Sequence, residues 1–407
     1  MADQLSVRII RCVAEVEEIR EAWSSWNRHP NSDVDHYLHV LASTPEILRP
    51  YVIVLNRYTR PEAMLIGRLE VRQMALNVGY ASLLKPKARA LTFIYGGLLG
   101  NASPEGAKIL VREIENSLRN GEADIAYLNH LRVNSALCDC VRRLPGFLSR
   151  DHFPTLQIHR SLILPDSVEQ FYASLSAKVR KNQKRQAKKL LGEFPGNVRT
   201  KCFREMAEIE LMVRDVAEIA KTTYQQGLGV GFVDSLELRR RLRLQVEKGW
   251  LRAYVLYIAE RPCAFWMGTL YKHTFHSDFM GYDPRYGKYS PGMFLIMKVI
   301  EGFCSHQGED DIGEIDFGLG DAQYKEVLAD REWPDAAVYV FAPTLKGFWL
   351  NFLRTPGILI DRFARKFLER TGLLAKIKSA WRTRIQRRER LRFDQEANVI
   401  VTAKSRR

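Results

Sequence analysis

The sequence contains no apolar run of the roughly 18 to 20 residues that a helix needs to cross a bilayer. Its first residues, Met1 to Gln4, also lack the basic and then apolar pattern of a secretory signal. The composition is otherwise that of an ordinary soluble protein. We therefore expect a cytoplasmic protein, with peripheral attachment to the inner face of the membrane as the alternative.

Cysteine is scarce, with six residues in 407, and only Cys138 and Cys140 lie close together. No two cysteines have the spacing of a zinc or redox pair. The nine histidines form neither a His-x-x-x-His nor a His-Glu-x-x-His pattern. We predict reduced thiols that are mostly buried, and neither a structural nor a catalytic metal.

The net charge of +15 lies almost entirely at the carboxyl end, where residues 346–407 carry 17 basic and 5 acidic side chains. In this tail, apolar residues recur three and four positions apart beside the basic ones. Such a pattern is typical of an interfacial helix that rests on an anionic membrane. The alternative is a tail that packs on the preceding domain.

The length of the chain indicates two domains, each able to bury its own core. Predicted strands in each half precede a helix that begins with Ser-Pro, at Ser103 and at Ser290, and further strands follow it. This shared order predicts a duplicated α/β fold (α+β mixed sheet), with domains at 1–165 and 166–345 and a basic amphipathic helical tail at 346–407. In the second half the predicted strands span 250–259, 263–271, 274–282, 312–317 and 336–341, and the main helices 167–192, 205–224, 236–247 and 290–306.

A Gly/Ser-rich turn lies between the strand that ends at Tyr282 and the helix that begins near Ser290. We expect Ser290 at the N-cap, Pro291 at the first helical position, and Gly292 where a phosphate can approach the backbone. A helix that opens directly after such a turn presents bare N–H groups to phosphate. The alternative is an ordinary helix start. The candidate phosphate ligands are the N–H groups of Gly292, Met293 and Phe294, flanked by Tyr286 and Lys288.

The turn Gly318-Leu319-Gly320-Asp321 follows a predicted strand and delivers polar side chains at its carboxyl end, where ligands of open mixed sheets bind. Asp321 could accept a proton from an acceptor, Tyr324 could protonate a leaving thiolate, and Lys325 could bind negative charge. The alternatives are an N-cap for Asp321, a half-buried ring for Tyr324 and a surface amine for Lys325. Asp316-Phe317-Gly318 does not indicate a protein kinase, because no His-Arg-Asp loop precedes it.

Two further polar sets are candidates for binding a substrate. His276 and Asp278 lie two apart on a strand and so share one face, although ordinary polar positions would look the same. A dense run of cations on the helix from 176 to 191 could hold phosphate, pyrophosphate or RNA, or could be a solvated face. This run comprises Lys178, Arg180, Lys181, Lys184, Arg185, Lys188 and Lys189.

As a set, these motifs resemble the GNAT acyltransferases. The resemblance is carried by Gly281-Tyr282-Asp283-Pro284, Tyr286, Ser290-Pro291-Gly292, the stretch 316–321 and Tyr324-Lys325. It is closest to the cellulose-biosynthesis acetyltransferase-like branch, which is related to the Fem-type peptidoglycan aminoacyltransferases. It covers about 160–345, and a Fem-type pair of tandem GNAT-like units would account for the rest. The set Ser176, Lys178, Arg180, Asn182 and Arg185 resembles the lead-in helix of that branch.

The resemblance implies an acyl donor that is a coenzyme A thioester or, in the Fem branch, an aminoacyl-tRNA, and an acceptor that is a sugar or a cell-envelope intermediate. It also implies acceptor binding by Arg180, Asn182 and Arg185. The common pyrophosphate pattern Gln/Arg-x-x-Gly-x-Gly/Ala is altered, because Gly287 and Ser290 replace its first two defined residues and only Gly292 is kept.

The leading hypothesis is an acyltransferase that moves an acetyl or other acyl group from coenzyme A to a hydroxyl or amine of a polysaccharide or envelope precursor. The alternatives are a Fem-like aminoacyltransferase that uses charged tRNA, and a non-catalytic membrane-apposed partner of a polysaccharide synthase. We expect the N-terminal domain to be structural or to shape the acceptor site.

Overall fold

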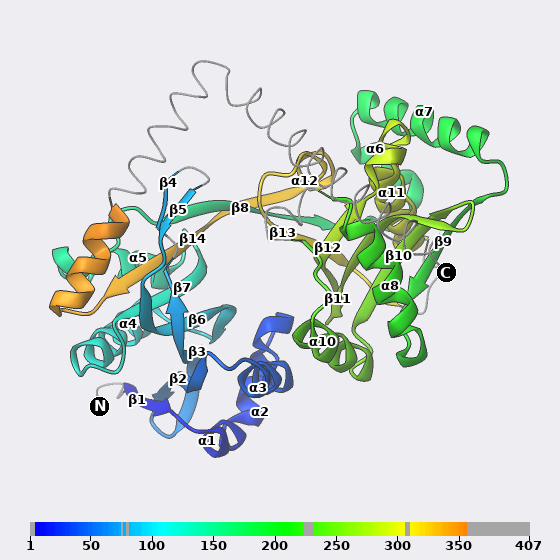
Figure 1. The fold of residues 1–407 in the computed structure, drawn as a ribbon. Helices are drawn as coiled ribbons and strands as arrows, with labels where there is room; N and C mark the ends of the chain where they lie inside the picture. Colours follow the sequence, from blue (N-terminus) through cyan, green and yellow to red (C-terminus); the bar gives the residue numbers. More distant parts are fainter. Residues whose placement is uncertain (1–4, 75, 79–80, 224–230, 306–309, 356–407) are drawn as a thin grey trace, which may run out of the picture. The chain divides into compact units, whose positions relative to one another are not determined.

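The computed structural model describes residues 5–74, 76–78, 81–223, 231–305 and 310–355. The chain divides into two compact units (Figure 1). Among the described residues, unit 1 comprises 5–159 and 333–355, and unit 2 comprises 160–332. Most of the predicted basic tail lies outside the described residues.

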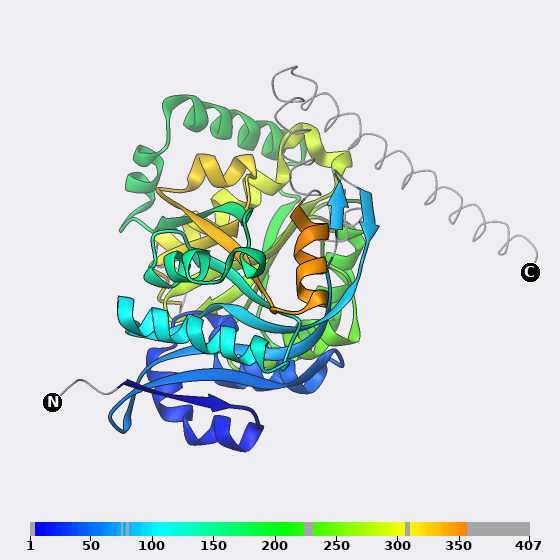
Figure 2. The same cartoon turned by 90° about the vertical axis from the view of Figure 1, so that its left-hand side faces the viewer.

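Unit 1 is built on a mixed sheet with the strand order β1-β2-β3-β6-β7-β14. Its strands pair antiparallel except for β6 and β7, which run parallel from Ala90↔Ile125 to Phe93↔Leu128. β4 (Leu76–Val78) and β5 (Ala81–Leu84) form a separate ribbon between β3 and β6 (Figure 2). The sheet strands are β1 (Leu5–Ile10), β2 (Ile47–Arg57), β3 (Arg60–Gln73), β6 (Lys87–Gly100), β7 (Ile125–Arg132) and β14 (Arg331–Phe341).

Helices cover both faces of this sheet, because successive side chains of a strand point to opposite sides and both sets are apolar here. On one face Leu65 and Phe93 pack against α4 (Pro104–Arg119) and α5 (Ala136–Arg143). On the other, Met64 and Ile66 pack against α1 (Val13–Glu18), α2 (Arg20–Trp26) and α3 (Val34–Ser43). Short 3₁₀ turns lie at η1 (Pro30–Ser32) and η2 (Phe147–Ser149).

Unit 2 repeats this plan with the strand order β8-β13-β12-β11-β10-β9, and β12 pairs parallel with β13. The strands are β8 (Thr155–Ile163), β9 (Val198–Phe203), β10 (Leu251–Ile258), β11 (Arg261–Tyr271), β12 (Thr274–Tyr282) and β13 (Glu314–Leu319). Trp266 and Phe275 pack on the face of α11 (Pro291–Cys304), α6 (Val168–Ser174) and α7 (Ala177–Glu193). Phe265 and Met267 pack on the face of α8 (Ile209–Ala220) and α10 (Leu236–Glu247).

The two units are structural repeats in which α4 corresponds to α11, and β6 and β7 correspond to β12 and β13. The last strand of each repeat joins the other unit. β14 follows the second repeat in sequence but pairs with β7 from Asp335↔Arg132 to Phe341↔Ile125. β8 follows the first repeat, yet Leu164 at its end donates to the carbonyl of Gly313 in unit 2 (2.9 Å). The predicted duplicated α/β fold is confirmed.

Most elements agree with the patterns in the sequence, and four differences concern the order and the partners of the elements. The helix predicted at 167–192 is two helices, since α6 ends at Ser174 and Ser176 caps α7. The strand β9 and the helix α3 carry no clear apolar period and were not predicted. β14 was assigned to the second domain, but from Trp333 onward it belongs to unit 1, because the pairing partner of a strand is not written in its own sequence.

A helix at 345–355 follows β14 and packs on unit 1 (orange in Figure 2). Its inner face buries Leu350, and the amide of Asn351 donates to the carbonyls of Leu148 (2.9 Å) and Arg150 (3.0 Å). Over the described parts of the chain, no helix has the length and apolar content required to cross a membrane.

The junction of β11 and β12 leads to a test of the fold. A Cβ added at Gly268 would collide with the carbonyl oxygen of His276. We expect Gly268→Ala to lower the free energy of unfolding by about 2 to 4 kcal/mol, because backbone must move in a packed sheet. Chemical denaturation measures this. Gly302→Ala in α11, where an added Cβ meets nothing within 4 Å, is the control and should stabilise by about 0.5 to 1 kcal/mol. Equal effects of the two changes would contradict this packing.

Candidate functional site

The parallel ladder between β12 and β13 is short and ends inside both strands. It runs from Thr274↔Glu314 to His276↔Asp316, although β12 continues to Tyr282 and β13 to Leu319. Just beyond it, β12 bulges against β11, where the register shifts between Met267 and Gly268. The strands therefore stop being partners at His276 and Asp316, in the middle of the sheet and at the carboxyl ends of the parallel pair, where ligands of such sheets bind.

A 3₁₀ turn, η4 (Pro284–Tyr289), joins β12 to α11 and is held by the buried carboxylate of Asp283. This carboxylate accepts from the backbone N–H of Arg285 (2.9 Å) and from its guanidinium (2.7 Å). The backbone N–H of Asp283 in turn donates to the carbonyl of Cys263 on β11 (2.8 Å). The loop is thus fixed to the sheet before α11 begins.

Ser290 occupies the N-cap position of α11, but the predicted side-chain cap is wrong. Its backbone is left-handed (φ 53°, ψ 51°), whereas capping serines have extended backbone, and its hydroxyl accepts no cap hydrogen bond. A non-glycine residue in this conformation is strained by about 1 kcal/mol, and such strain clusters at functional loops.

The first turn of α11 leaves two backbone N–H groups that the helix itself does not use. The first intrahelical bond runs from the N–H of Phe294 to the carbonyl of Ser290 (3.0 Å), and Pro291 has no N–H. The N–H groups of Gly292 and Met293 therefore remain as the candidate phosphate donors of the predicted set. Tyr282 lies over Gly292, 3.3 Å from a Cβ built there, and the ammonium of Lys288 is exposed.

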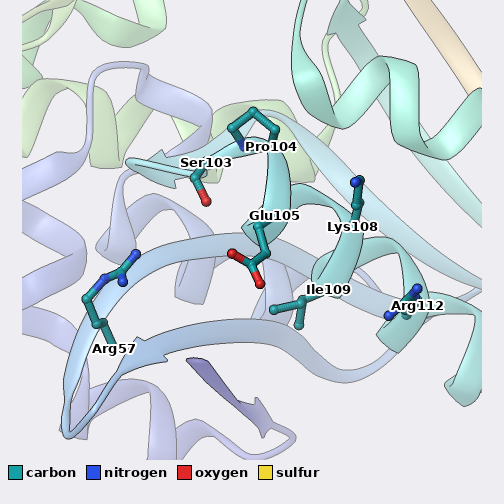
Figure 3. A pocket seen from close by; sticks show the side chains of 7 residues that line it. All are labelled: Arg57, Ser103, Pro104, Glu105, Lys108, Ile109 and Arg112. Carbon is teal, nitrogen blue, oxygen red and sulfur yellow. The ribbon is translucent and has the colours of Figure 1, made fainter. Parts of the chain in front are cut away.

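The equivalent helix of unit 1 begins differently. The hydroxyl of Ser103 accepts from the N–H of Gly106 (3.1 Å), and Glu105 places a carboxylate in the first turn of α4. A pocket of about 770 Å³ lies there, with Lys108, Arg112 and Arg57 around Glu105 (Figure 3). The hydroxyl of Ser103 already occupies one N–H group of this first turn, and the carboxylate of Glu105 opposes the attraction of the nearby cations for an anion. Of the two helix starts, α11 is the better one for phosphate.

The basic helix α7 lies beside η4. The ammonium of Lys189 is 3.3 Å from the carbonyl oxygen of Lys288 and 5.5 Å from the ring centre of Tyr289. Phe194, just after α7, packs edge-on to Tyr286 (6.4 Å) and Tyr289 (5.5 Å). The cations on the outer side of α7 are exposed, namely Lys178, Lys181, Lys184, Arg185 and Lys188. The structure thus brings two predicted sets, the α11 turn and the basic helix, to one surface of unit 2.

The three predicted acceptor ligands on α7 have different environments. The guanidinium of Arg180 donates to the carbonyls of Tyr172 (3.1 Å) and Leu175 (2.7 Å) and so closes the carboxyl end of α6. Asn182 accepts from Arg185 (3.0 Å), and both side chains are exposed. Arg180 therefore holds the junction of α6 and α7, whereas Asn182 and Arg185 face solvent.

Two buried cations donate hydrogen bonds to the carbonyl groups of the glycine turn at the end of β13. Gly318 (φ 70°) and Gly320 (φ 111°) have backbone conformations that side chains disfavour. The ammonium of Lys325 donates to the carbonyl of Leu319 (2.7 Å), and the guanidinium of Arg160 donates to that of Gly320 (3.1 Å). Asp316 accepts from the N–H of Gly318 (2.7 Å). The turn is therefore fixed by charged groups at the place where the ladder ends.

The three predicted catalytic residues lie on this turn and on α12 (Gln323–Leu328). Asp321 is exposed and does not cap α12, since the N-cap is Ala322. Tyr324 is half-buried and packs edge-on to Phe317 (6.0 Å). Lys325 is buried rather than on the surface.

The pKa of Lys325 is lowered to about 8. Burial is the largest cause, Asp316 opposes it, Arg160 adds to the lowering, and Asp321 opposes it. The amine of Lys325 therefore changes charge near neutral pH, which is common among groups that take part in catalysis.

His276 and Asp278 are held by different partners on β12. His276 is buried, and its Nδ1 lies 3.2 Å from a carboxylate oxygen of Asp316. Asp278 accepts from the hydroxyl of Thr269 (2.8 Å) and pairs with Arg241 of α10 (2.8 Å). Of the two, His276 is the one at the end of the parallel ladder.

Three residues of the site were not assigned from the sequence, namely Arg160, Asp283 and Asp316. Arg160 lies on β8, far in sequence from the turn that it braces, and no local pattern marks it. Asp283 gave a usable signal, because an aspartate before Pro284 favours a turn. Asp316 and His276 become neighbours only through the parallel register.

Comparisons with known proteins agree with this geometry. Residues 177–326 match the family described as Acetyltransferase (GNAT) domain. This stretch runs from the start of α7 into α12 and contains the α11 turn, His276, Asp316 and the glycine turn. Unit 2 therefore contains a GNAT domain, and the chain is an acyltransferase.

Solved structures extend the likeness to both units. The crystal structure of FemX is 8% identical, with a TM-score of 0.51 over 81% of this chain and 96% of that one. A tandem GNAT protein from the clavulanic acid biosynthesis pathway is 10% identical (TM-score 0.46; 83% and 99% covered). The C-terminal domain of a putative lysylphosphatidylglycerol synthetase from Agrobacterium fabrum is 11% identical (TM-score 0.48; 84% and 96% covered). No curated protein sequence matches the chain. The predicted Fem-related fold is confirmed.

The buried amine of Lys325 makes stability depend on pH. The folded state loses this proton near pH 8, while the unfolded chain keeps it to about 10.5. Between these values the unfolded state binds more protons, so the wild type gains stability as the pH rises. We expect the difference in unfolding free energy between wild type and Lys325→Met to grow by roughly 2 to 3 kcal/mol from pH 7 to pH 10.

Urea unfolding at both pH values measures this difference. Lys298→Met, which removes an amine on α11 whose side chain is 48% exposed, is the control and should show little change with pH. If the difference in unfolding free energy between wild type and Lys325→Met did not change with pH, the amine of Lys325 would not be desolvated in the folded protein.

Proposed function

We propose that unit 2 transfers an acetyl or other acyl group from coenzyme A to a hydroxyl or amine of a polysaccharide or cell-envelope precursor. The observation that carries this proposal is the α11 turn. Its two unused N–H groups, with the exposed Lys288 beside them, suit a pyrophosphate, and it follows directly on the strand that parts from β13. In this proposal unit 2, without β14 and the helix that follows it, is the catalytic domain, and acetyl-coenzyme A is a co-substrate.

In the proposed reaction, three side chains handle the protons and the negative charge. The acceptor oxygen or nitrogen adds to the thioester carbonyl, and the carbon–sulfur bond breaks. Asp321, exposed on the turn, takes the proton of the acceptor, and Tyr324 protonates the thiolate that leaves. Lys325, in its charged form below about pH 8, stabilises the developing negative charge. Asp321→Asn and Lys325→Ala should each reduce turnover, and intact turnover in both would remove this assignment.

The substrate side is assigned to groups on α7 and β12. Asn182 and Arg185 are exposed on α7, the helix whose Lys189 contacts η4, and they suit a polar or phosphorylated acceptor, with Arg180 positioning the helix. His276, at the end of the ladder, and Asp278, in the bulge, would line the acyl end of the site.

Transfer of an aminoacyl group from tRNA is the second candidate. The exposed cations of α7, adjacent to η4, favour it, because a row of lysines and arginines binds phosphates of RNA. FemX supplies the same fold but, at 8% identity, shows no more than the fold. Binding of bulk tRNA that falls steeply with salt and is lost in Lys184→Ala/Lys188→Ala would favour this candidate.

Calorimetry with acetyl-coenzyme A tests the leading proposal. We expect micromolar binding to the full chain that is lost in Gly292→Glu, because a carboxylate there repels the pyrophosphate. Gly302→Glu places the same charge at the other end of α11, in open space, and should bind like the wild type. Equal binding by all three would place the coenzyme elsewhere, and no binding to any would favour charged tRNA or a non-catalytic partner of a polysaccharide synthase.

We also propose that the protein rests on an anionic membrane through an apolar patch on unit 1, which consists of Phe147, Leu148, Leu345, Trp349 and Phe352. These side chains are 50 to 90% exposed. Large apolar side chains that gather on a surface in this way mark sites of interaction. Helix 345–355 and η2 are joined through Asn351, and the following residues supply most of the positive charge of the chain. Exposed Trp, Phe and Leu beside lysines and arginines suit an interface with acidic lipids.

Co-sedimentation with phosphatidylglycerol vesicles tests the patch. We expect Trp349→Ser/Phe352→Ser, and a chain that ends at residue 355, each to bind about tenfold more weakly than the full chain. Leu236→Ser, which removes a leucine that is 66% exposed on α10 of unit 2, is the control. Equal binding by all variants, or equal binding to neutral phosphatidylcholine, would exclude this role.

A further inference from the structure

Unit 1 contains a second pocket, of about 270 Å³, on the side of its sheet that faces α3. It lies where the parallel strands β6 and β7 part. Their ladder ends at Phe93↔Leu128, and the lining residues Thr92 and Tyr127 form its last pair on this face. In unit 2 the last pair on the corresponding face is His276 and Asp316. The pocket thus occupies in unit 1 the place that His276 and Asp316 occupy in unit 2.

The floor of the pocket carries two arginines held by one buried carboxylate. Arg68 lies 2.7 Å and Arg72 3.1 Å from the oxygens of Glu70, which also accepts from Thr92 (2.7 Å). Burial alone would raise the pKa of Glu70, but the two arginines lower it below its usual value, so the carboxylate is charged. The three groups together carry one net positive charge.

Both guanidiniums keep donors for a ligand. Each has five N–H groups, and their side chains are 22% (Arg68) and 31% (Arg72) exposed. The guanidinium of Arg72 also lies over the ring of Tyr127 (4.2 Å), which fixes its plane. Two planar guanidiniums, in a cluster whose net charge is +1, suit a single carboxylate or phosphate group.

The other polar residues that line the pocket suit a ligand with several hydroxyl groups. Amides are present at Asn31 and Asn129, and a hydroxyl at Tyr95. The amide oxygen of Asn129 accepts from the hydroxyl of Tyr127 (3.1 Å) and lies 2.6 Å from Nδ1 of His130, and the hydroxyl of Tyr95 lies 2.8 Å from Nδ1 of His159. A hydroxyl can make more than one hydrogen bond, and the amide nitrogen of Asn129 has two N–H groups of its own. Amides and hydroxyls both donate and accept, as sugar hydroxyls require. The volume is at the lower limit of small-molecule pockets and corresponds to about one sugar ring.

We propose that this pocket binds an acidic monosaccharide unit, a sugar phosphate or a sugar carboxylate. Arg68 and Arg72 take the anionic group, and Asn31, Asn129 and Tyr95 take the hydroxyls. This chemistry matches the acceptor class proposed for unit 2, but the inference rests on unit 1 alone and holds whether or not unit 2 uses coenzyme A.

Calorimetry of the full chain without any acyl donor tests this site. The probes are glucose 1-phosphate and glucuronate, with glucose and inorganic phosphate as comparisons. We expect at least one acidic sugar to bind, and Arg72→Gln to weaken that binding about tenfold or more, the loss expected for one charged hydrogen-bonding partner. The better probe identifies the anionic group as phosphate or carboxylate.

Two further variants make the result specific. Val40→Phe fills the pocket from α3 without removing a charge, and it should also weaken binding even if Arg72→Gln folds poorly. Lys108→Gln removes a cation from the other pocket of unit 1 and should leave binding unchanged. The proposal is overturned if no acidic sugar binds at several millimolar, if glucose or inorganic phosphate binds as tightly as the acidic sugars, or if Lys108→Gln weakens binding as much as Arg72→Gln.

Discussion

The short parallel ladder between β12 and β13 is the constraint on which the candidate active site depends. Because it ends at His276 and Asp316, the two strands can turn to different neighbours, and the sheet opens at its centre. Asp316 connects the two sides of this opening, since its carboxylate contacts His276 and also accepts from the N–H of Gly318. The glycine turn begins next to Asp316, and Lys325 and Arg160 hold it in place through its carbonyl groups. A continuous ladder would leave no place for a substrate between the strands.

Duplication gave the protein two such openings with different chemistry. In unit 2 the central helix begins at a strained, uncapped Ser290 beside exposed lysines, whereas in unit 1 Ser103 caps the equivalent helix and Glu105 disfavours an anion. The opening between β6 and β7 carries a compact cluster of two arginines and one glutamate in place of a histidine and an aspartate. One repeat is therefore suited to hold a phosphorylated donor at its helix, and the other to hold a small acidic group at its sheet.

Much of the architecture could be predicted from local patterns, because strands and amphipathic helices repeat with periods that are visible in the sequence. The strand at 274–282 and the helix at 236–247 have the predicted bounds. The helix start at Pro291 was also visible, since proline and glycine have strong backbone preferences. The conformation of Ser290 was not, because the fixed η4 turn, held by Asp283, forces a left-handed backbone on a residue that would otherwise cap the helix.

The sequence by itself determined the order of the elements, their duplication, the basic carboxyl end and the positions of the two turns that carry the candidate donor and catalytic groups. These features depend on neighbours in the chain, whose preferences act over a few residues. Only the tertiary structure decided that His276 meets Asp316, that Arg160 and Lys325 brace one turn, that β14 joins the first unit, and that Arg68 and Arg72 share Glu70. Such contacts join residues distant in sequence, or depend on burial, and both arise only when strands choose their partners and pack.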